Sequence, residues 1–549
     1  MKDIFRYCKI YTVKHRGSIA LYAILCVIAG FLSLAIPYIS GSFIDFLTIG
    51  TDKNQLFKYC LLFGFMSTCG LLIGYTVNRQ YTKLLIKLSY DVNKDVVSHL
   101  QKVSALFFTE KNVSYLNQRI NNDSNTVISF YLQTIESILI NSIKIIFPFA
   151  YLALTNRYVV AIAVGAILFL FSGYKHLRGY VFKCGYDYKE KQSLYFSKLN
   201  EQLENLRFVK SHGIEESFLM RLAKSFGSLF ISSLKYQNAS YAFSGLETII
   251  TTIAQIGLYI VCGIQVIDKK MTIGEFTILS TYFALIIGAS RYYFGLGKSV
   301  QDTKISYMRL TELFNIDVIQ SGNIVPECID TVSFNRCSFS YGSKPIIHNF
   351  SYTFHSGNVY VIRGKNGSGK TTLISLVLGL FGKNYNGEIL VNGLPIQDIN
   401  QHILNQKFVA IYEQEPILFN DSIMYNLTLC DNNQSDKINL ILMLAQKLNA
   451  DNLIKSLLED DRKKVGENGS NLSSGEKSKI ALIRTFLQDS DVIILDEPTA
   501  YLDTTSVEMF KLYIEEVKKS KLLLIITHDD ALMDLADCIL DAELLTTNQ

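Results

Sequence analysis

The stretch that decides the fold of the second half of the chain is GNVYVIRGKNGSGKTTLISLVLGL, residues 357–380. It opens with an apolar, strand-like run, Val359–Ile362, passes through a glycine-rich turn and ends in a helical pattern that starts near Lys370. Residues 364–371 fit G-x-x-x-x-G-K-[ST] in the strand–turn–helix context that this phosphate-binding motif requires. The stretch therefore predicts an α/β P-loop domain that binds a nucleotide.

The residue types of this loop suit a polyphosphate. Glycines allow backbone N–H groups to close around the β-phosphate, Lys370 would neutralise charge on the β- and γ-phosphates, and the Thr371 hydroxyl would bind Mg²⁺. The predicted phosphate-binding set is Gly364, Lys365, Asn366, Gly367, Ser368, Gly369, Lys370, Thr371 and Thr372.

Two further apolar strands are followed by residues that suit hydrolysis. The strand within DVIILDEPTA (491–500) ends in adjacent carboxylates, Asp496 and Glu497. In P-loop folds an aspartate at such a strand end holds Mg²⁺, and an adjacent carboxylate can be the general base for an attacking water. The strand LLLIIT is followed by His528 at the same predicted sheet edge. With the P-loop, these residues predict hydrolysis of the nucleotide.

The sequence of the first half of the chain predicts a membrane domain. Six apolar stretches are long enough for the roughly 20 residues that a spanning helix needs. They lie at 18–40, 56–78, 132–154, 157–177, 244–267 and 272–294. The first is too long for a cleaved signal peptide and lacks a small-residue cleavage site, so we expect it to span. A chain of 549 residues is too long for one core, and its net charge of +4 gives no indication of a nucleic-acid partner.

The connections between these stretches alternate in length and charge. Those after the second and fourth stretches are long, rich in Lys and Arg and helical in periodicity, whereas the others are short. The positive-inside rule predicts that both long connections and both termini are cytoplasmic. We expect helices that continue beyond the membrane and turn near 105–120 and 205–218.

Four charged residues in the apolar stretches are candidates for lining a substrate cavity. Lys144 is expected about 18 Å from the outer loop, near the middle of the bilayer, where a charge usually faces a cavity or a partner. A plain pairing at a helix interface accounts for Lys144 equally well. Glu136, Glu247 and Arg291 are expected nearer the cytoplasmic face, where they could line an inward-open mouth.

The stretch NLSSGEKSKIALIRTF, 471–486, has two interpretations. Ser473 and Glu476 form the S-x-x-E pattern of a capping box that starts a helix. The same helix N-terminus, with its free backbone amides and a Ser hydroxyl, suits a phosphate. A cap needs no partner elsewhere in the sequence, whereas a phosphate site does.

The ordered set of motifs resembles a known family. Residues 330–549 resemble the nucleotide-binding domain of an ATP-binding cassette (ABC) transporter, and residues 1–310 resemble the six-helix membrane domain of its type IV exporters, with 311–329 as a linker. The matching motifs are FSYG with the adenine-stacking Tyr341, the Walker A loop 364–372, the Q-loop Gln414, the signature LSSGE at 472–476, the Walker B strand VIILDE, Asp503 of the D-loop and the switch residue His528. The implied fold is an all-α six-helix membrane domain followed by an α/β P-loop cassette.

The resemblance implies a role for each matching residue, with ATP and Mg²⁺ as cofactors. Glu497 would be the general base, His528 would sense the γ-phosphate, and Gln414 would touch Mg²⁺ and the attacking water. The implied Mg²⁺ set is Thr371, Gln414 and Asp496.

The resemblance also implies a second chain. Cassettes of this family enclose two ATP molecules head to tail, so we expect a dimer of half-transporters in which Ser473, Gly475 and Glu476 face the ATP of the partner. The turning points Phe107–Asn112 and Val209–Glu215 resemble the coupling helices that dock onto the cassettes.

We expect the chain to drive export of an amphipathic substrate by alternating access, the substrate being a peptide or bacteriocin, a lipid-like or a drug-like compound. The alternative is an ATP-gated channel or a regulatory ABC protein without vectorial pumping. The expected location is a bacterial cell membrane, with lipids around the helices and the ATPase domain in the cytoplasm. Homodimer and heterodimer fit the sequence equally well. Ser474 and Glu476 depart from the usual signature, LSGGQ, so altered turnover is expected there first.

Overall fold

The computed structural model describes the chain except for residues 50–51, 111–112, 366, 430–436, 459–463 and 546–549. The chain divides into two compact units. The first contains Met1–Ser98 and Ser114–Asn315, and the second contains His99–Val113 and Ile316–Gln549. A short segment from the first half of the sequence therefore belongs to the unit that carries the P-loop.

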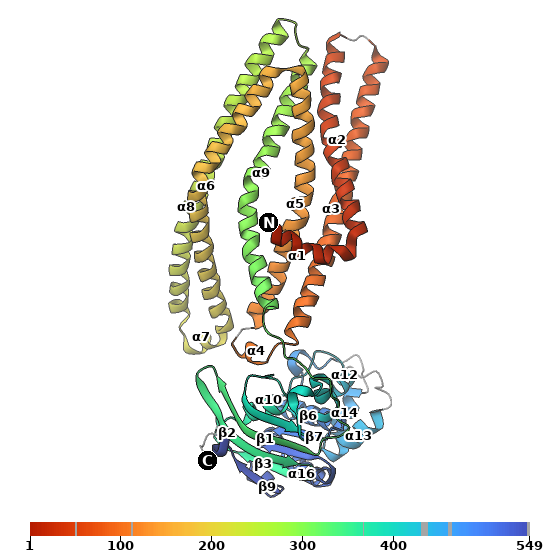
Figure 1. The fold of residues 1–549 in the computed structure, drawn as a ribbon, viewed down its shortest axis with the longest axis vertical. Coiled ribbons are helices and arrows are strands. Elements are labelled where there is room, and N and C mark those ends of the chain that lie inside the picture. The colour runs from red at the N-terminus through yellow and green to blue at the C-terminus, as the bar shows by residue number, and fades with distance from the viewer. Residues whose placement is uncertain (50–51, 111–112, 366, 430–436, 459–463, 546–549) are drawn as a thin grey trace. The chain divides into compact units, whose positions relative to one another are not determined.

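The first unit is made of helices (Figure 1). Its main elements are α1 (Lys2–Thr12), α2 (Arg16–Ile49), α3 (Lys53–Leu100), α5 (Val113–Thr155), α6 (Arg157–Glu204), α7 (Leu206–His212), α8 (Glu215–Ile267) and α9 (Ile273–Phe314). Among the described residues, six helices are long and apolar enough to cross a membrane. Each coincides with one of the predicted apolar stretches, and most continue well beyond it, which confirms the predicted six-helix domain.

Local sequence determines where two of these helices begin. The side chain of Asn156 accepts the N–H groups of Tyr158 and Val159, which starts α6 directly after α5. Thr272 and Glu275 form a capping box that starts α9. Both caps satisfy backbone donors that would otherwise be unpaired at a helix N-terminus, so sharp turns can connect the long helices.

Helices α2 and α9 approach each other closely near the start of α9. A Cβ atom on Gly274 would lie 2.1 Å from the carbonyl oxygen of Gly41, so only glycine fits at this position. Asp45 of α2 accepts hydrogen bonds from the Thr272 hydroxyl at 2.7 Å and from the Gly274 N–H at 2.6 Å. Packing and hydrogen bonding therefore hold the two helices together at this end.

The second unit is an α/β cassette with two sheets (Figure 1). An antiparallel sheet has the order β2–β1–β4–β5, and a parallel sheet has the order β6–β7–β8–β3–β9. The strands are β1 (Thr331–Tyr341), β2 (Lys344–His355), β3 (Val359–Arg363), β4 (Asn386–Val391), β5 (Leu394–Pro395), β6 (Val409–Tyr412), β7 (Val492–Asp496), β8 (Leu522–Ile526) and β9 (Cys538–Asp541). Strands β7 and β8 are apolar and buried, as expected for parallel strands covered on both faces.

Further helices of this unit follow strand β3 in the sequence. They are α10 (Lys370–Val377), α11 (Gln401–Ile403), α12 (Ile423–Thr428), α13 (Ile438–Lys447), α14 (Asp451–Leu458), α15 (Ser474–Leu487), α16 (Thr504–Val517) and α17 (Asp530–Met533). Alternate side chains of β3 enter different cores because a strand points successive residues to opposite faces. Tyr360 and Ile362 pack in the core that includes α10, whereas Val359 and Val361 pack with α13, α15 and α16. This arrangement confirms the predicted α/β class.

Residues 99–113, which contain α4 (Leu106–Glu110), are part of the cassette unit. The N–H of Ala105 donates to the carbonyl oxygen of Leu380 at 2.9 Å, which ties this segment to the end of the helical turn after α10. The predicted coupling region Phe107–Asn112 begins in this segment, and its last two residues lie outside the described residues.

Candidate ATP site

The residues that carry chemistry follow the carboxyl ends of parallel strands. Strand β3 leads into the P-loop, β6 leads toward Gln414, β7 ends at Asp496, and β8 is followed by His528. Because these strands are parallel neighbours in the order β6–β7–β8–β3, the residues meet along one edge of the sheet. This edge is where open α/β sheets bind their ligands.

The P-loop is shaped to receive an anion. Gly367 and Gly369 have φ angles of 83° and 100°, a left-handed conformation that residues with a side chain rarely adopt. Between them, the Oγ of Ser368 is buried and has no hydrogen-bond partner in the described part of the chain. An unpaired buried hydroxyl beside the N-terminus of α10 fits a phosphate oxygen.

Lys370, the first residue of α10, is held by groups of the loop itself. Its Nζ donates to the carbonyl oxygen of Gly364 and, at 3.4 Å, to that of Lys365. The same Nζ lies 3.1 Å from Nε2 of His528. Because these partners are neutral carbonyls and an imidazole, a phosphate oxygen would be a stronger partner for the ammonium group.

The backbone of Glu497 directs its carboxylate toward β8. Glu497 has a φ of 51°, and its N–H donates to the carbonyl oxygen of Ile526 at 2.8 Å. Its Oε2 accepts the Thr527 hydroxyl at 3.3 Å and the N–H of His528 at 3.4 Å, and Nε2 of His528 lies 3.8 Å from Oε1. An unusual φ that is held by neighbouring strands is typical of residues at functional sites.

Asp496 has a different environment from its neighbour. Burial raises its pKa above the ordinary value, Glu497 adds to the rise, and Lys370 opposes it. A bound cation would compensate the charge of this partly buried carboxylate. Asp496, the amide of Gln414 and the hydroxyl of Thr371 offer the oxygen donors that Mg²⁺ prefers, so the residues present fit that ion.

A cavity of about 350 Å³ brings these residues together. It is lined by Tyr341, Lys344, Ile346, Gly367, Ser368, Gly369, Lys370, Thr371, Thr372, Gln414, Asp496 and Glu497. Lys344 and Ile346 were not predicted; their place just after Tyr341 in the β1–β2 hairpin is the signal that could have identified them. Asn366 of the predicted loop lies outside the described residues.

The signature residues begin α15 and do not line this cavity in the described chain. The Ser473 hydroxyl accepts the N–H of Glu476 at 3.3 Å, and Oε2 of Glu476 accepts the Ser473 N–H at 2.7 Å and its hydroxyl at 2.8 Å. The predicted capping box is therefore formed. The hydrogen bond from the Ser473 backbone, followed by that from its side chain, lowers the pKa of Glu476.

Asp503, the predicted D-loop residue, joins α15 to α16. Its Oδ1 accepts the N–H of Ser506 at 2.9 Å, which caps α16, and its Oδ2 accepts the Ser506 hydroxyl at 2.9 Å. Lys479 of α15 pairs with Oδ2 at 3.0 Å. The backbone hydrogen bond from Ser506, with the help of Lys479, lowers the pKa of Asp503. The loop after β7 is thus fixed to the signature helix.

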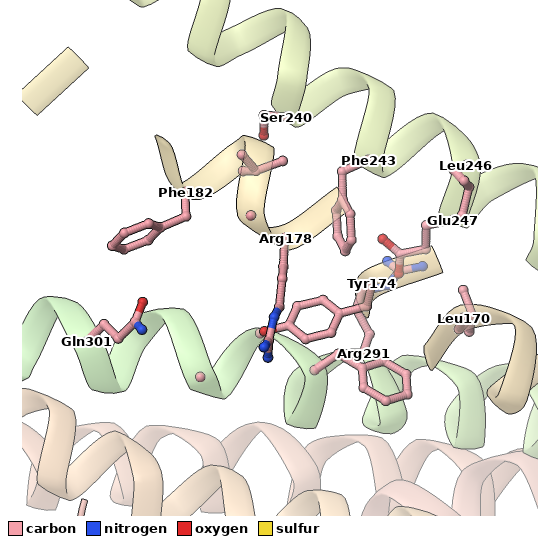
Figure 2. Close-up of a pocket in the computed structure, with 15 residues that line it drawn as sticks. Leu170, Tyr174, Arg178, Phe182, Ser240, Phe243, Leu246, Glu247, Arg291 and Gln301 are labelled. Atoms are coloured by element: carbon pink, nitrogen blue, oxygen red, sulfur yellow. Dashed lines mark ion pairs between the residues drawn. The ribbon is translucent and has the colours of Figure 1, made fainter. Parts of the chain in front are cut away.

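Two of the four charged candidates in the helical unit contact each other. Glu247 of α8 and Arg291 of α9 form an ion pair (Figure 2). Glu136 of α5 instead accepts the hydroxyl of Tyr22 from α2 at 2.6 Å. Lys144 of α5 has no ion-pair partner in the part of the chain that the structure describes.

Comparison with known protein families decides the identity. The model of the ABC transporter transmembrane region matches residues 19–290, and the ABC transporter model matches residues 347–500. The chain belongs to the ABC transporter family. Most of the first match falls in the helical unit and the second falls in the cassette, which confirms the family and the fold class that the motifs predicted.

This ABC transporter has distant relatives whose sequence matches extend over most of its length. It is 26% identical over 539 residues to heavy metal tolerance factor 1 of Caenorhabditis elegans, covering 94% of this chain and 65% of the relative. It is 23% identical over 517 residues to ABC transporter B family member 1 of Dictyostelium discoideum, and this match covers 91% of this chain and 55% of the relative. The chain thus spans less than two thirds of the length of these two relatives. A Staphylococcus aureus protein named as a putative multidrug export ATP-binding/permease protein is 26% identical to this chain over 473 residues. This match covers 83% of this chain and 79% of that protein.

The fold of this ABC transporter is that of a solved exporter. It is similar to the structure of a bacterial Atm1-family ABC exporter with ATP bound, with a TM-score of 0.81 and 19% identity. The match covers 96% of this chain and 93% of the other. The likeness therefore extends over both the helical unit and the cassette.

Proposed function

We propose that this ABC transporter hydrolyses ATP to export an amphipathic substrate by alternating access. The observation that carries the proposal is a cavity at which the P-loop, Gln414, Asp496 and Glu497 meet, in a chain whose described residues include six helices suited to a membrane. A phosphate cavity beside a general base suits turnover rather than binding alone. Long apolar helices in the same chain suit a substrate that crosses a bilayer.

The P-loop would bind the phosphates of ATP. Lys370 would exchange its contacts with the loop carbonyls for contacts with phosphate oxygens. The Ser368 hydroxyl, which has no partner among the described residues, would donate to one of them. Thr371, Gln414 and Asp496 would hold Mg²⁺, which neutralises charge on the phosphates when it is bound.

Glu497 would act as the general base. It takes a proton from a water molecule as that oxygen bonds to the γ-phosphorus and the bond to the ADP oxygen breaks. The hydrogen bonds from Thr527 and from the His528 backbone orient its carboxylate for this step. His528, which lies beside both Lys370 and Glu497, is positioned to respond to the γ-phosphate.

A second chain would complete each ATP site. Ser473 and Gly475 are at the tip of α15, and the cavity lined by the P-loop of the same chain does not include them. In a head-to-tail pair this tip would face the γ-phosphate held by the partner. We infer that two half-transporters work together, with Asp503 linking the signature helix to the loop that follows Glu497.

We further propose a bacterial cell membrane as the location, with both termini and the cassette in the cytoplasm. The Lys- and Arg-rich long connections support this orientation. The hydrogen bond between Ala105, in the first long connection, and Leu380 of the cassette supports it independently, because it requires both on the same side.

Reconstitution into proteoliposomes tests the proposal. With ATP on the cassette side, the wild-type protein should accumulate a fluorescent amphipathic probe inside the vesicles and hydrolyse ATP faster when the probe is present. The Glu497→Gln variant should bind ATP without uptake. An ATP-opened ion conductance without uptake would overturn the proposal in favour of a channel.

A further inference from the structure

A cavity of about 530 Å³ lies between α6, α8 and α9 of the helical unit (Figure 2). Its lining includes Tyr174 and Arg178 of α6, Phe243 and Glu247 of α8, and Arg291 and Phe294 of α9. Side chains three or four positions apart share one face of a helix. Each of the three helices therefore presents at least one aromatic and one charged side chain to the same space, and α6 adds Phe182.

The aromatic side chains form a continuous apolar wall. The ring centroid of Tyr174 lies 6.1 Å from that of Phe243 and 6.0 Å from that of Phe294, and the second pair is stacked with 24° between the planes. A Cβ atom on Gly297 would lie 3.3 Å from the hydroxyl oxygen of Tyr174, so a small residue there leaves room for the ring. Such a wall suits a flat ring or an acyl chain.

The charges in the cavity do not cancel. Glu247, whose side chain is 14% exposed, is already paired with Arg291. Arg178 has no hydrogen bond or ion pair in the described part of the chain, and it extends from α6 toward α9 beside the ring of Tyr174 (Figure 2). Two guanidinium groups and one carboxylate leave one positive charge in excess. Arg178 is exposed, so its guanidinium is accessible for a charge-assisted hydrogen bond with an anionic ligand whose apolar part packs on the adjacent rings.

The depth of the cavity suits an amphipathic molecule. At 1.5 Å per residue, Arg178 is about 33 Å along α6 from the cap at Asn156. The hydrocarbon core of a bilayer is about 30 Å thick, so the charged part of the cavity is expected at the boundary between lipid tails and water. A ligand there can keep a charged group at the interface and place an apolar group against the rings.

The geometry points to a binding site for an amphipathic anion, with its carboxylate, sulfonate or phosphate group on Arg178 and its apolar part against Tyr174, Phe243 and Phe294. This inference rests on the proposed export function and adds the charge of the substrate to it.

Fluorescence quenching tests the site in the intact transporter without any nucleotide. The chain contains no tryptophan, so Phe182→Trp at the edge of the cavity creates a single reporter. The probes are N-dinitrophenyl-aminohexanoate, its neutral amide and the corresponding cationic amine, which share one quenching ring and differ in charge. The protein is held in nanodiscs of zwitterionic phosphatidylcholine.

The acid should bind about tenfold more tightly than the amide, the difference expected for one charge-assisted hydrogen bond. Arg178→Gln should remove this preference, and Arg178→Lys should keep part of it. Glu247→Gln should strengthen binding of the acid, because it removes the competing carboxylate. Lys175→Gln is the matched control on the same helix, and it should leave the titration unchanged because Lys175 does not line the cavity.

Equal binding of acid and amide by the reporter protein, or tightest binding of the amine, would overturn the inference. If Arg178→Gln does not fold, Arg178→Lys and Glu247→Gln still decide the outcome. Repeating the titration with anionic phosphatidylglycerol separates two sources of the ligand: weaker probe binding indicates a membrane lipid, and unchanged binding indicates a soluble amphipath. Because no ATP is used, failure of this titration is distinguishable from failure of ATP-driven uptake.

Discussion

Adjacent carboxylates at the end of β7, Asp496 and Glu497, have different surroundings, which suit the different roles that we propose for them. Asp496 is partly buried and has a raised pKa, and a bound cation would compensate its charge. Glu497 turns away through its positive φ and receives hydrogen bonds from Thr527 and His528. A positive φ in a residue other than glycine costs about 1–3 kcal/mol of conformational free energy, and the surrounding paired strands must offset this cost. Such a division of environment is how proteins separate a metal ligand from a general base.

Glu476 places a negative charge where a phosphate is expected, and it uses the Ser473 N–H and hydroxyl that could otherwise serve that phosphate. We expect Glu476→Gln to lower the KM for ATP about two- to fivefold, corresponding to the ~0.3–1 kcal/mol that one charge contributes at a helix N-terminus. Steady-state ATPase assays measure this. A raised or unchanged KM would show that the carboxylate does not compete with the nucleotide.

The cap on α15 should depend on pH. Because hydrogen bonds from Ser473 hold the pKa of Glu476 below its ordinary 4.5, the ionised side chain stabilises the folded state fully above that pH, and the contribution is lost as pH falls through the folded pKa. Hydrogen exchange at the start of α15, compared with Glu476→Gln at each pH, should show a difference at neutral pH that shrinks below 4.5. A difference independent of pH would contradict this assignment.

At the scale of elements, the strand–turn–helix around the P-loop could be predicted because its signals are local: an apolar run, glycines and Lys370 at fixed spacing. The six long helices could be predicted for the same reason. Contacts across helices could not be predicted, because no local pattern fixes which faces meet. Packing of α8 against α9 pairs Glu247 with Arg291, and packing of α2 against α9 brings Asp45 to the cap of α9.

The Asp503 cap should couple α16 to the signature helix. Replacement of Asp503 by Ala removes the cap and lowers the stability of the helix by about 1 kcal/mol. Replacement by Asn keeps a good N-cap and removes only the charge that pairs with Lys479. Hydrogen exchange in the first turn of α16 should therefore accelerate in Asp503→Ala and change little in Asp503→Asn. Equal acceleration in both variants would mean that the ion pair, and not the cap, fixes the loop.

The close contact of α2 and α9 gives a second prediction at this scale. Gly274→Ala would force a methyl group against the backbone of Gly41 and the carboxylate of Asp45, and overpacking of this kind costs about 1–3 kcal/mol. We expect a lower thermal unfolding temperature for the detergent-solubilised protein. Gly288→Ala on the same helix is the control, since no atom lies within 4 Å of a Cβ placed there. Equal temperatures for the two variants would contradict the contact.

At the scale of the whole molecule, the residues that we propose for ATP binding lie on two separate surfaces of one chain. The cavity at the sheet edge is lined by the P-loop and Glu497, whereas Gly475 lies in the first turn of α15 and does not line that cavity. The sequence order of these motifs indicates the family, but only the placement of α15 shows that the tip of its helix does not line its own chain's cavity. Two chains arranged head to tail would join the two surfaces.

The measurement that tests this account most directly is ATP hydrolysis by a purified mixed dimer, with Glu497→Gln in one subunit and Gly475→Asp in the other. Each variant alone should lose hydrolysis, through loss of the base or through a negative charge brought to the phosphate. A shared site predicts that the mixed dimer regains activity, because one of its two sites then combines an intact Glu497 with an intact Gly475. Activity no higher than that of either single variant would contradict the account.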